Sequence, residues 1–166
     1  LYEQWLDTPE ILKTFAVHHR TGEPMPDALI AKLKAARVFN QGFATVEYVA
    51  SAIVDLDFHS LATAEGLDPA AFERAALDRI GMPEEIVMRH RPPHHGHVFS
   101  GGYYASAYYS YMWSEVLDAD AFAAFEETGD IFNPEVAKKL AQNVLSAGGS
   151  RDPAELYTAF RGRLPT

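Results

Sequence analysis

Residues 42–59 read GFATVEYVASAIVDLDFH, and apolar side chains recur in them at the spacing of an α-helix. The apolar positions are Phe43, Val46, Ala50, Ile53 and Val54, and Leu61 continues the series. Apolar residues at this spacing share one face of a helix, which must be covered by other elements. The segment from about Gly42 to His59 is therefore predicted to be a central core helix.

Four further helix starts are marked by a small polar residue that is followed directly by proline. They are Thr8-Pro9, Asp68-Pro69, Asn133-Pro134 and Asp152-Pro153. The polar side chain can accept a hydrogen bond from the first turn, and a proline at the first helical position loses none. Each pair predicts a helix that begins at its proline.

The remaining signals also favour helices. A helix is predicted from Asp27 to about Phe39, where Ala, Leu and Lys dominate, and Gly148-Gly149 is expected to end the helix that begins at Pro134. Hairpin turns and sustained alternation of apolar with polar residues do not occur. The chain is predicted to be all-α, a single helical segment over residues 1–166, with an ordered functional loop from Arg91 to Gly102.

Composition excludes several classes of protein. The 166 residues are 48% hydrophobic, and 14 Lys plus Arg against 23 Asp plus Glu give a net charge of −9. This balance argues against disorder, nucleic-acid binding and attraction to anionic membranes. The absence of cysteine excludes disulfides and thiolate metal sites. The sequence shows neither a signal peptide nor an initiator Met, so we interpret it as a piece of a longer, cytoplasmic protein.

The predicted loop carries an unusual density of histidines. His90, His94, His95 and His97 lie beside Pro92-Pro93, which stiffen the entry, and ahead of Gly101-Gly102, which free the exit. Four imidazoles could form a metal site, although the two prolines prevent a helix from presenting His90 and His94 on one face. The alternative is that these histidines form hydrogen bonds with backbone or substrate.

Tyrosines follow the loop directly, because residues 103–113 read YYASAYYSYMW. On a helix Tyr104, Tyr108 and Tyr111 would stand at i, i+4 and i+7, within about 60° of one another. Tyr109 and Trp113 would form a second pair on the opposite side, suited to burial. The rings can be core aromatics with locally satisfied hydroxyls. Alternatively, the phenols can donate hydrogen bonds to a carbonyl oxygen that becomes an oxyanion.

The sequence resembles a known family at this point. The run HVFSGGYYASAYYSYMWSE over residues 97–115 is similar to the C-terminal signature of the thimet oligopeptidase family of zinc metallopeptidases, most of all its peptidyl-dipeptidase Dcp and oligopeptidase A branch. Four other segments match the same family: FNQGFAT at 39–45, DLDFH at 55–59, RHRPPH at 89–94 and GGSRD at 148–152. The resemblance covers essentially the whole chain.

The resemblance implies a multi-helical C-terminal part of a two-lobed, zincin-like oligopeptidase that hydrolyses short peptides, by removing dipeptides or by cutting within the peptide. In that family the zinc is held by an HExxH helix and a later glutamate. No HExxH motif occurs here, and residues 1–5 resemble the stretch that follows the ligand glutamate, where Glu3 could orient a ligand histidine. The resemblance also implies that the chain is truncated at both ends. We therefore expect zinc in the parent enzyme, no catalytic metal ligand in this chain, and inactivity without the missing N-terminal part.

The resemblance also implies roles for individual residues. Tyr108 and Tyr111 fall on tyrosines that bind the scissile carbonyl and stabilise the tetrahedral intermediate. His97, Gly101, Gly102 and Tyr104 fall on the flexible loop that contacts bound peptide. Ser106-Ala107 and Tyr103 depart from the family pattern, which leaves the conformation of this loop open. Asp55 and His59, four residues apart, are interpreted as a helix-stabilising pair.

Two readings of a different class stay open. The chain can be a non-enzymatic helical module that binds a peptide or protein through the tyrosines. It can also be a small metal-binding protein centred on His90, His94, His95 and His97.

Overall fold

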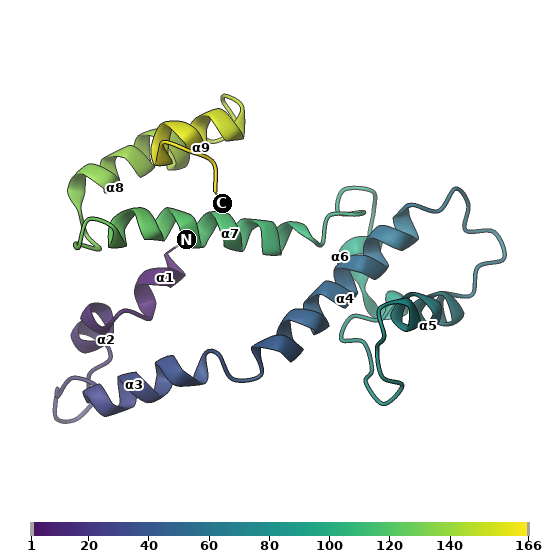
Figure 1. The fold of residues 1–166 in the computed structure, drawn as a ribbon, viewed down its shortest axis with the longest axis horizontal. Coiled ribbons are helices and arrows are strands. Elements are labelled where there is room, and N and C mark those ends of the chain that lie inside the picture. The colour runs from purple at the N-terminus through teal and green to yellow at the C-terminus, as the bar shows by residue number, and fades with distance from the viewer. Residues whose placement is uncertain (1, 166) are drawn as a thin grey trace. The chain divides into compact units, whose positions relative to one another are not determined.

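The computed structural model describes residues 2–165, and the chain forms two compact units, each treated separately below (Figure 1). Unit 1 contains residues 1–34 and 113–166, and unit 2 contains residues 35–112. The helices of the described residues are α1 (Glu3–Leu6), α2 (Pro9–Phe15), α3 (Asp27–Ala36), α4 (Gln41–His59), α5 (Pro69–Arg79), α6 (Gly96–Phe99), α7 (Ser110–Glu126), α8 (Pro134–Leu140) and α9 (Pro153–Arg161). Residues 2–165 contain no strand, only an isolated bridge between Val17 and Pro24, so the all-α prediction is confirmed.

All four predicted caps are present. The Thr8 hydroxyl accepts from the Ile11 N–H, and the side chains of Asp68, Asn133 and Asp152 each accept from two backbone N–H groups of the first turn. In each helix the proline follows at the first position. These local hydrogen bonds explain why the starts of α2, α5, α8 and α9 could be predicted to the residue.

Unit 1 is held together by aromatic and aliphatic side chains from α7, α8 and α9, which are green to yellow in Figure 1. Its buried cluster contains Ala121, Phe125, Leu140, Tyr157 and Phe160. Trp5 of α1 packs against this cluster and donates its indole N–H to the Ile131 carbonyl oxygen at 2.7 Å. A π-helical turn, Ala141–Leu145, follows α8. The helical segment that begins at Pro134 therefore ends before Gly148, as predicted.

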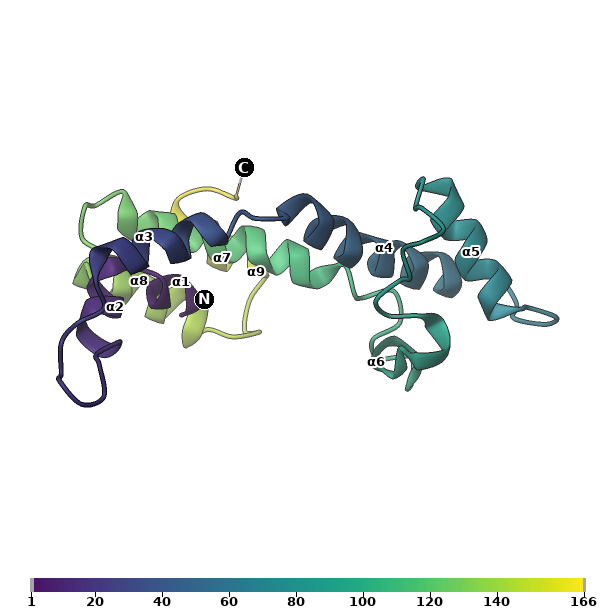
Figure 2. The same ribbon diagram turned by 90° about the horizontal axis from the view of Figure 1, so that it is seen from below.

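Unit 2 is built on α4, against which α5 packs (Figure 2). The buried cluster consists of Ala50 and Val54 from α4, Ala76 and Leu77 from α5, and Met88 from the segment that follows. This packing holds the second half of α4 next to residues 90–102, called the histidine loop below.

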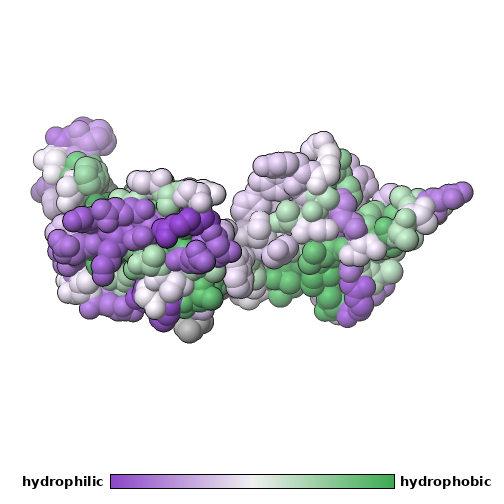
Figure 3. Space-filling view, turned by 90° about the horizontal axis from the view of Figure 1, so that it is seen from above, coloured by the Kyte–Doolittle hydropathy of each residue, from purple (hydrophilic) through white to green (hydrophobic). Residues whose placement is uncertain are grey.

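The prediction of a central core helix with a covered apolar stripe holds for only part of α4. Ala50 and Val54 are buried, whereas Phe43 and Val46 are 53% and 52% exposed, and Leu61, beyond the end of α4, is 39% exposed. Hydrophobic surface (green) gathers on the right-hand part of Figure 3, which carries α4 to α6. The hydrophobic spacing identified the helix correctly, but it could not show that part of its apolar face is left uncovered in this chain.

Candidate functional site

The candidate site lies in unit 2, where the histidine loop meets the start of α7. The predicted loop contains two short helical turns, a 3₁₀ turn at Pro92–His94 and α6 at Gly96–Phe99. Its entry is held by Arg91, whose Nε donates to both carboxylate oxygens of Glu73 on α5 at 2.9 and 3.1 Å. Glu73 is itself buried, so this ion pair fixes the beginning of the loop to the unit 2 core.

The expected tyrosine helix is wrong for two of its three members. Helix α7 begins at Ser110, so Tyr111 is helical, whereas Tyr104 and Tyr108 lie in the preceding turns. Ser106 has a φ of 58°, which a right-handed helix cannot contain. The Ala107 N–H bonds to the Tyr104 carbonyl oxygen at 3.1 Å, which closes a turn in place of a helical turn.

The turn nevertheless brings three of the predicted site residues to one pocket of about 480 Å³. Its lining includes Tyr108, Tyr111 and His97, together with Tyr48, His90, His94, His95 and Gly96. Tyr104 adjoins them, because its ring centroid lies 4.4 Å from that of His97. Gly101 and Gly102 are exposed in the turn between α6 and Tyr104, and Gly101 has a φ of 145°, a conformation that favours glycine.

Three of the four imidazoles that line this pocket are arranged as a stack. The rings of His90 and His95 are 4.8 Å apart with an interplanar angle of 18°, and His95 and His97 follow at 6.5 Å and 17°. The Tyr108 ring meets all three edge-on, at centroid distances between 4.8 and 6.3 Å. The Tyr108 hydroxyl lies 3.3 Å from His90 Nδ1, and that of Tyr111 lies 3.0 Å from His97 Nε2.

Burial and neighbouring groups favour the neutral forms of His90, His95 and Tyr111. Burial lowers the pKa of His90, with a further contribution from Arg89 that outweighs the opposing effect of Glu47. Burial also lowers the pKa of His95, aided by His90. The pKa of Tyr111 is raised by a hydrogen bond with Tyr104 and by desolvation. The phenol of Tyr111 therefore keeps its proton, and with it the ability to donate a hydrogen bond, into the alkaline range.

The phenols remain open to solvent. Tyr111 is 43% exposed, and Tyr104 and Tyr108 are half-buried. By contrast, Tyr109 and Trp113, expected to be buried, are 52% and 60% exposed. Glu3, which the family resemblance suggested could orient a ligand histidine, lies in unit 1 and is exposed.

Sequence reasoning missed a polar stripe on α4 that holds this site. Tyr48, Ser51, Asp55 and His59 stand at i, i+3, i+7 and i+11, which places them on one helix face. Ser51 and Asp55 are buried, and Ser51 Oγ lies 3.3 Å from His90 Nδ1. The signal was present in the sequence as polar residues at helical spacing within an otherwise apolar segment.

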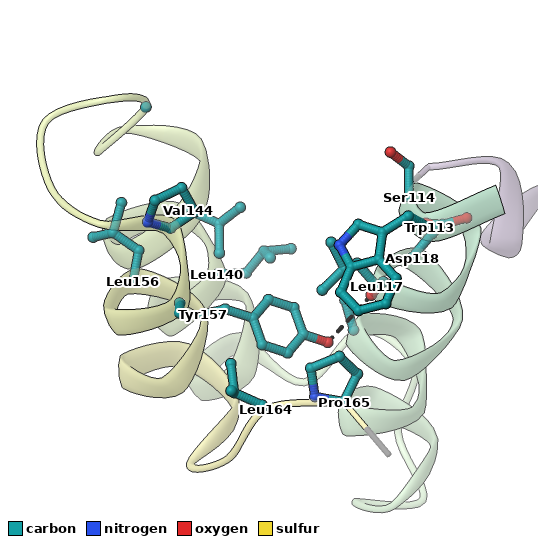
Figure 4. A pocket seen from close by; sticks show the side chains of 14 residues that line it. Trp113, Ser114, Leu117, Asp118, Leu140, Val144, Leu156, Tyr157, Leu164 and Pro165 are labelled. Carbon is teal, nitrogen blue, oxygen red and sulfur yellow. Dashed lines mark hydrogen bonds between the residues drawn. The ribbon is translucent and has the colours of Figure 1, made fainter. Parts of the chain in front are cut away.

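A second, larger cavity lies in unit 1 and has a volume of about 630 Å³ (Figure 4). Its lining is mostly aliphatic, from residues such as Leu117, Leu140 and Val144, with Ser114, Asp118 and Tyr157 as polar groups. The Tyr157 ring projects toward α7 (Figure 4), and its hydroxyl donates to the Leu117 carbonyl oxygen at 3.2 Å and to Asp120 Oδ2 at 2.6 Å. None of the predicted site residues lines this cavity.

Comparison with known proteins gives the site its context. A family model described as Peptidase family M3 matches residues 1–166. The chain belongs to this family. Oligopeptidase A of Escherichia coli is 36% identical over 164 residues, dipeptidyl carboxypeptidase of the same organism 34% over 166, and the "Probable cytosolic oligopeptidase A" of Arabidopsis thaliana 34% over 175. These alignments cover 98–99% of this chain but only 24% of each relative, so the chain spans about a quarter of their length.

Membership of family M3 confirms the resemblance and its oligopeptidase A and dipeptidyl carboxypeptidase branch. The fold is that of an all-α C-terminal part of such a peptidase. No helix among residues 2–165 is long and apolar enough to cross a membrane.

Zinc is the metal that the family resemblance implies, but the described residues do not form a site for it. Within residues 2–165 no three His, Asp or Glu side chains are arranged to hold a metal ion. The histidine stack turns flat faces toward one another, whereas metal coordination requires ring nitrogens that converge on one point. The reading of this chain as a small metal-binding protein therefore finds no support in the geometry.

Proposed function

We propose that this chain supplies the transition-state phenols of a zinc-dependent M3 peptidase that hydrolyses short peptides. The observation that carries the proposal is the convergence of the Tyr108 and Tyr111 hydroxyls on one open pocket, beside His97 and Tyr104. In peptide hydrolysis the carbonyl oxygen gains negative charge, and fixed O–H donors stabilise it more than they stabilise the substrate.

In this proposal each site residue has a separate role. Tyr108 and Tyr111 donate hydrogen bonds to the developing oxyanion. Tyr104 and His97 contact the bound peptide and hold Tyr111, because His97 Nε2 lies 3.0 Å from its hydroxyl. Gly101 and Gly102 allow the turn before Tyr104 to follow the peptide backbone.

We further propose that the zinc ligands, and the rest of the cleft, come from the part of the peptidase that this chain does not span. Two observations support this. The relatives are about four times as long as the aligned region, and Phe39, just before α4, and Phe43, in its first turn, are 78% and 53% exposed. We propose the cytoplasm as its location, in line with the name of the Arabidopsis relative, and neither nucleic acid nor a membrane as a partner.

The phenols are tested by Tyr108→Phe and Tyr111→Phe in the peptidase expressed from its complete reading frame. Each change should lower kcat roughly 100-fold, the usual effect of about 3 kcal/mol for one lost oxyanion donor, with a smaller change in KM. Tyr109→Phe is the matched control, because Tyr109 is exposed and does not line the pocket. Unchanged turnover in both variants would make these tyrosines packing residues.

A second experiment tests the division of labour between this chain and the rest of the protein. The isolated 166-residue chain should bind no stoichiometric zinc in equilibrium dialysis and should not hydrolyse short peptides. Tight zinc binding that is lost in a variant without His90, His94, His95 and His97 would favour the metal-binding alternative. Peptide binding, with no hydrolysis even by the protein from the complete reading frame, would favour the non-enzymatic module.

A further inference from the structure

Unit 2 contains a fully buried carboxylate next to the turn that includes Ser106 and Tyr108. The Asp55 side chain has no exposed surface and lies on α4, outside the pocket lining. A buried carboxylate is costly unless hydrogen-bond donors surround it. The donors that surround Asp55 therefore indicate what this residue does.

Two of these donors belong to the backbone of the turn. The Ser106 N–H donates to Asp55 Oδ1 at 3.1 Å, and the Tyr108 N–H donates to Oδ2 at 3.0 Å. The third donor is His59 Nδ1, one helical turn further along α4, at 2.7 Å from Oδ1. Both oxygens of one side chain thus bond a segment that lies more than 50 residues away in the sequence.

A second side chain of α4 holds the other end of the same residue. The Tyr48 hydroxyl donates to the Tyr108 carbonyl oxygen and accepts from the Met112 N–H at 3.3 Å. Tyr48 and Asp55 are seven residues apart, on one face of the helix. Both the N–H and the C=O of Tyr108 are therefore bonded to α4.

The conformation that these bonds hold is an unfavourable one. Ser106 adopts a φ of 58°, in the left-handed region that residues other than glycine rarely occupy. Such a conformation persists only where the surroundings stabilise it. The bond from the Ser106 N–H to Asp55 provides this stabilisation at the strained residue itself.

We propose that Asp55 is a positioning residue: its buried carboxylate holds the Ser106–Tyr108 turn and thereby places the Tyr108 phenol at the pocket. The catalytic consequence rests on the proposed function of Tyr108. The structural part, that the carboxylate holds the turn, stands independently and can be measured without any activity.

The first test measures backbone hydrogen exchange in the wild-type chain and in Asp55→Asn. In the wild type, the Ser106 and Tyr108 amides should exchange at least tenfold more slowly than that of Tyr103, which is 94% exposed. Asp55→Asn retains the shape of the side chain but turns an N–H₂ toward one backbone N–H. It should accelerate exchange at Ser106 or Tyr108 at least tenfold. Asp57→Asn is the matched control, because Asp57 pairs with Arg79 on α5 and should leave both amides unchanged.

Unprotected Ser106 and Tyr108 amides in the wild type would overturn the proposal even if the variant failed to fold. Equal exchange at both amides in the wild type and a folded Asp55→Asn chain would overturn it too.

The second test uses peptide hydrolysis by the protein from the complete reading frame. Asp55→Asn should lower kcat at least tenfold with KM within threefold, whereas Asp57→Asn should retain wild-type values. Adding Ser106→Gly, which removes the strain at that position, should restore part of the lost kcat. A residue needed only for stability would not show this split or this rescue. Wild-type kcat in Asp55→Asn would overturn the positioning role, whereas wild-type kcat in Tyr108→Phe would overturn the proposed function and leave the amide result valid.

Discussion

Tyr111 carries a phenol that interacts with two neighbouring side chains, and this determines how tightly it holds its proton. Its hydroxyl bonds with that of Tyr104 and lies 3.0 Å from His97 Nε2. The bond to Tyr104 contributes most to raising the pKa of Tyr111 above the ordinary value of 10.0, and desolvation adds to it. A phenol with a raised pKa loses its proton later as the pH increases.

This predicts the alkaline absorbance titration of the chain. The step that disappears in Tyr111→Phe should lie above pH 10, and Tyr104→Phe should move that step toward lower pH because it removes the main cause of the shift. Ultraviolet difference spectra at the phenolate absorbance measure both effects. Tyr103→Phe, a change at a 94% exposed position, should leave the Tyr111 step in place. A Tyr111 step at or below pH 10 would contradict the hydrogen-bonded arrangement.

At the scale of the helix, α9 depends on its cap. The Asp152 carboxylate accepts from the Ala154 N–H at 2.8 Å and the Glu155 N–H at 3.2 Å. The helix it starts contributes Leu156, Tyr157 and Phe160 to the buried side chains of unit 1. Loss of the cap should therefore weaken the packing of the whole unit.

We expect Asp152→Ala to lower the free energy of unfolding of unit 1 by about 1 kcal/mol, the usual cost of removing an N-cap acceptor. Asp152→Asn keeps an acceptor oxygen and should retain nearly all of the stability. Urea unfolding followed by tryptophan fluorescence measures both variants, because Trp5 and Trp113 both belong to unit 1. An equal loss in the two variants would show that the charge, and not the cap, is responsible.

The same helices show how far the sequence could be interpreted. Cap and proline pairs act within one turn, so the starts of α2, α5, α8 and α9 were predictable from adjacent residues. The conformation of the tyrosine segment, residues 103–111, could not be predicted in this way, because it depends on a distant side chain. Helical spacing predicted a stripe, yet the Tyr108 N–H bonds to Asp55 instead of a carbonyl of the preceding turn, and Ser106 takes a left-handed φ.

The candidate site was therefore recognised by residue type and by family resemblance, with the wrong local geometry. His97, Tyr104, Tyr108 and Tyr111 do lie together, but through a turn held by α4. The pairing of Asp55 with His59 was predicted correctly, at 2.7 Å. The hydrogen bonds from the backbone to Asp55 were not predicted, because their donors, Ser106 and Tyr108, are 51 and 53 residues away in the sequence.

At the scale of the whole molecule, the two units respond to pH through different groups. In unit 2 burial lowers the pKa of His90 and His95 below the ordinary value of 6.5. In unit 1, burial raises the pKa of Asp120, but hydrogen bonds from Tyr157, Arg163 and Arg161 outweigh burial and leave it below 3.8. The unfolded chain therefore binds more protons than the folded chain in two separate pH ranges.

Stability decreases as the pH is lowered wherever the unfolded state binds more protons than the folded state. Unit 2 should therefore begin to lose stability as the pH falls below about 6.5, and unit 1 only below about 3.8. Hydrogen exchange in α4 and α5 should accelerate first, whereas tryptophan fluorescence, which reports on unit 1, should change later.

The double variant His90→Gln/His95→Gln should flatten the first response, since glutamine does not titrate, and Asp120→Asn should flatten the second. His94→Gln, a change at an exposed histidine, is the control for the first response. If both probes changed together, at a pH unaffected by the His90 and His95 substitutions, acid sensitivity would not arise from these imidazoles.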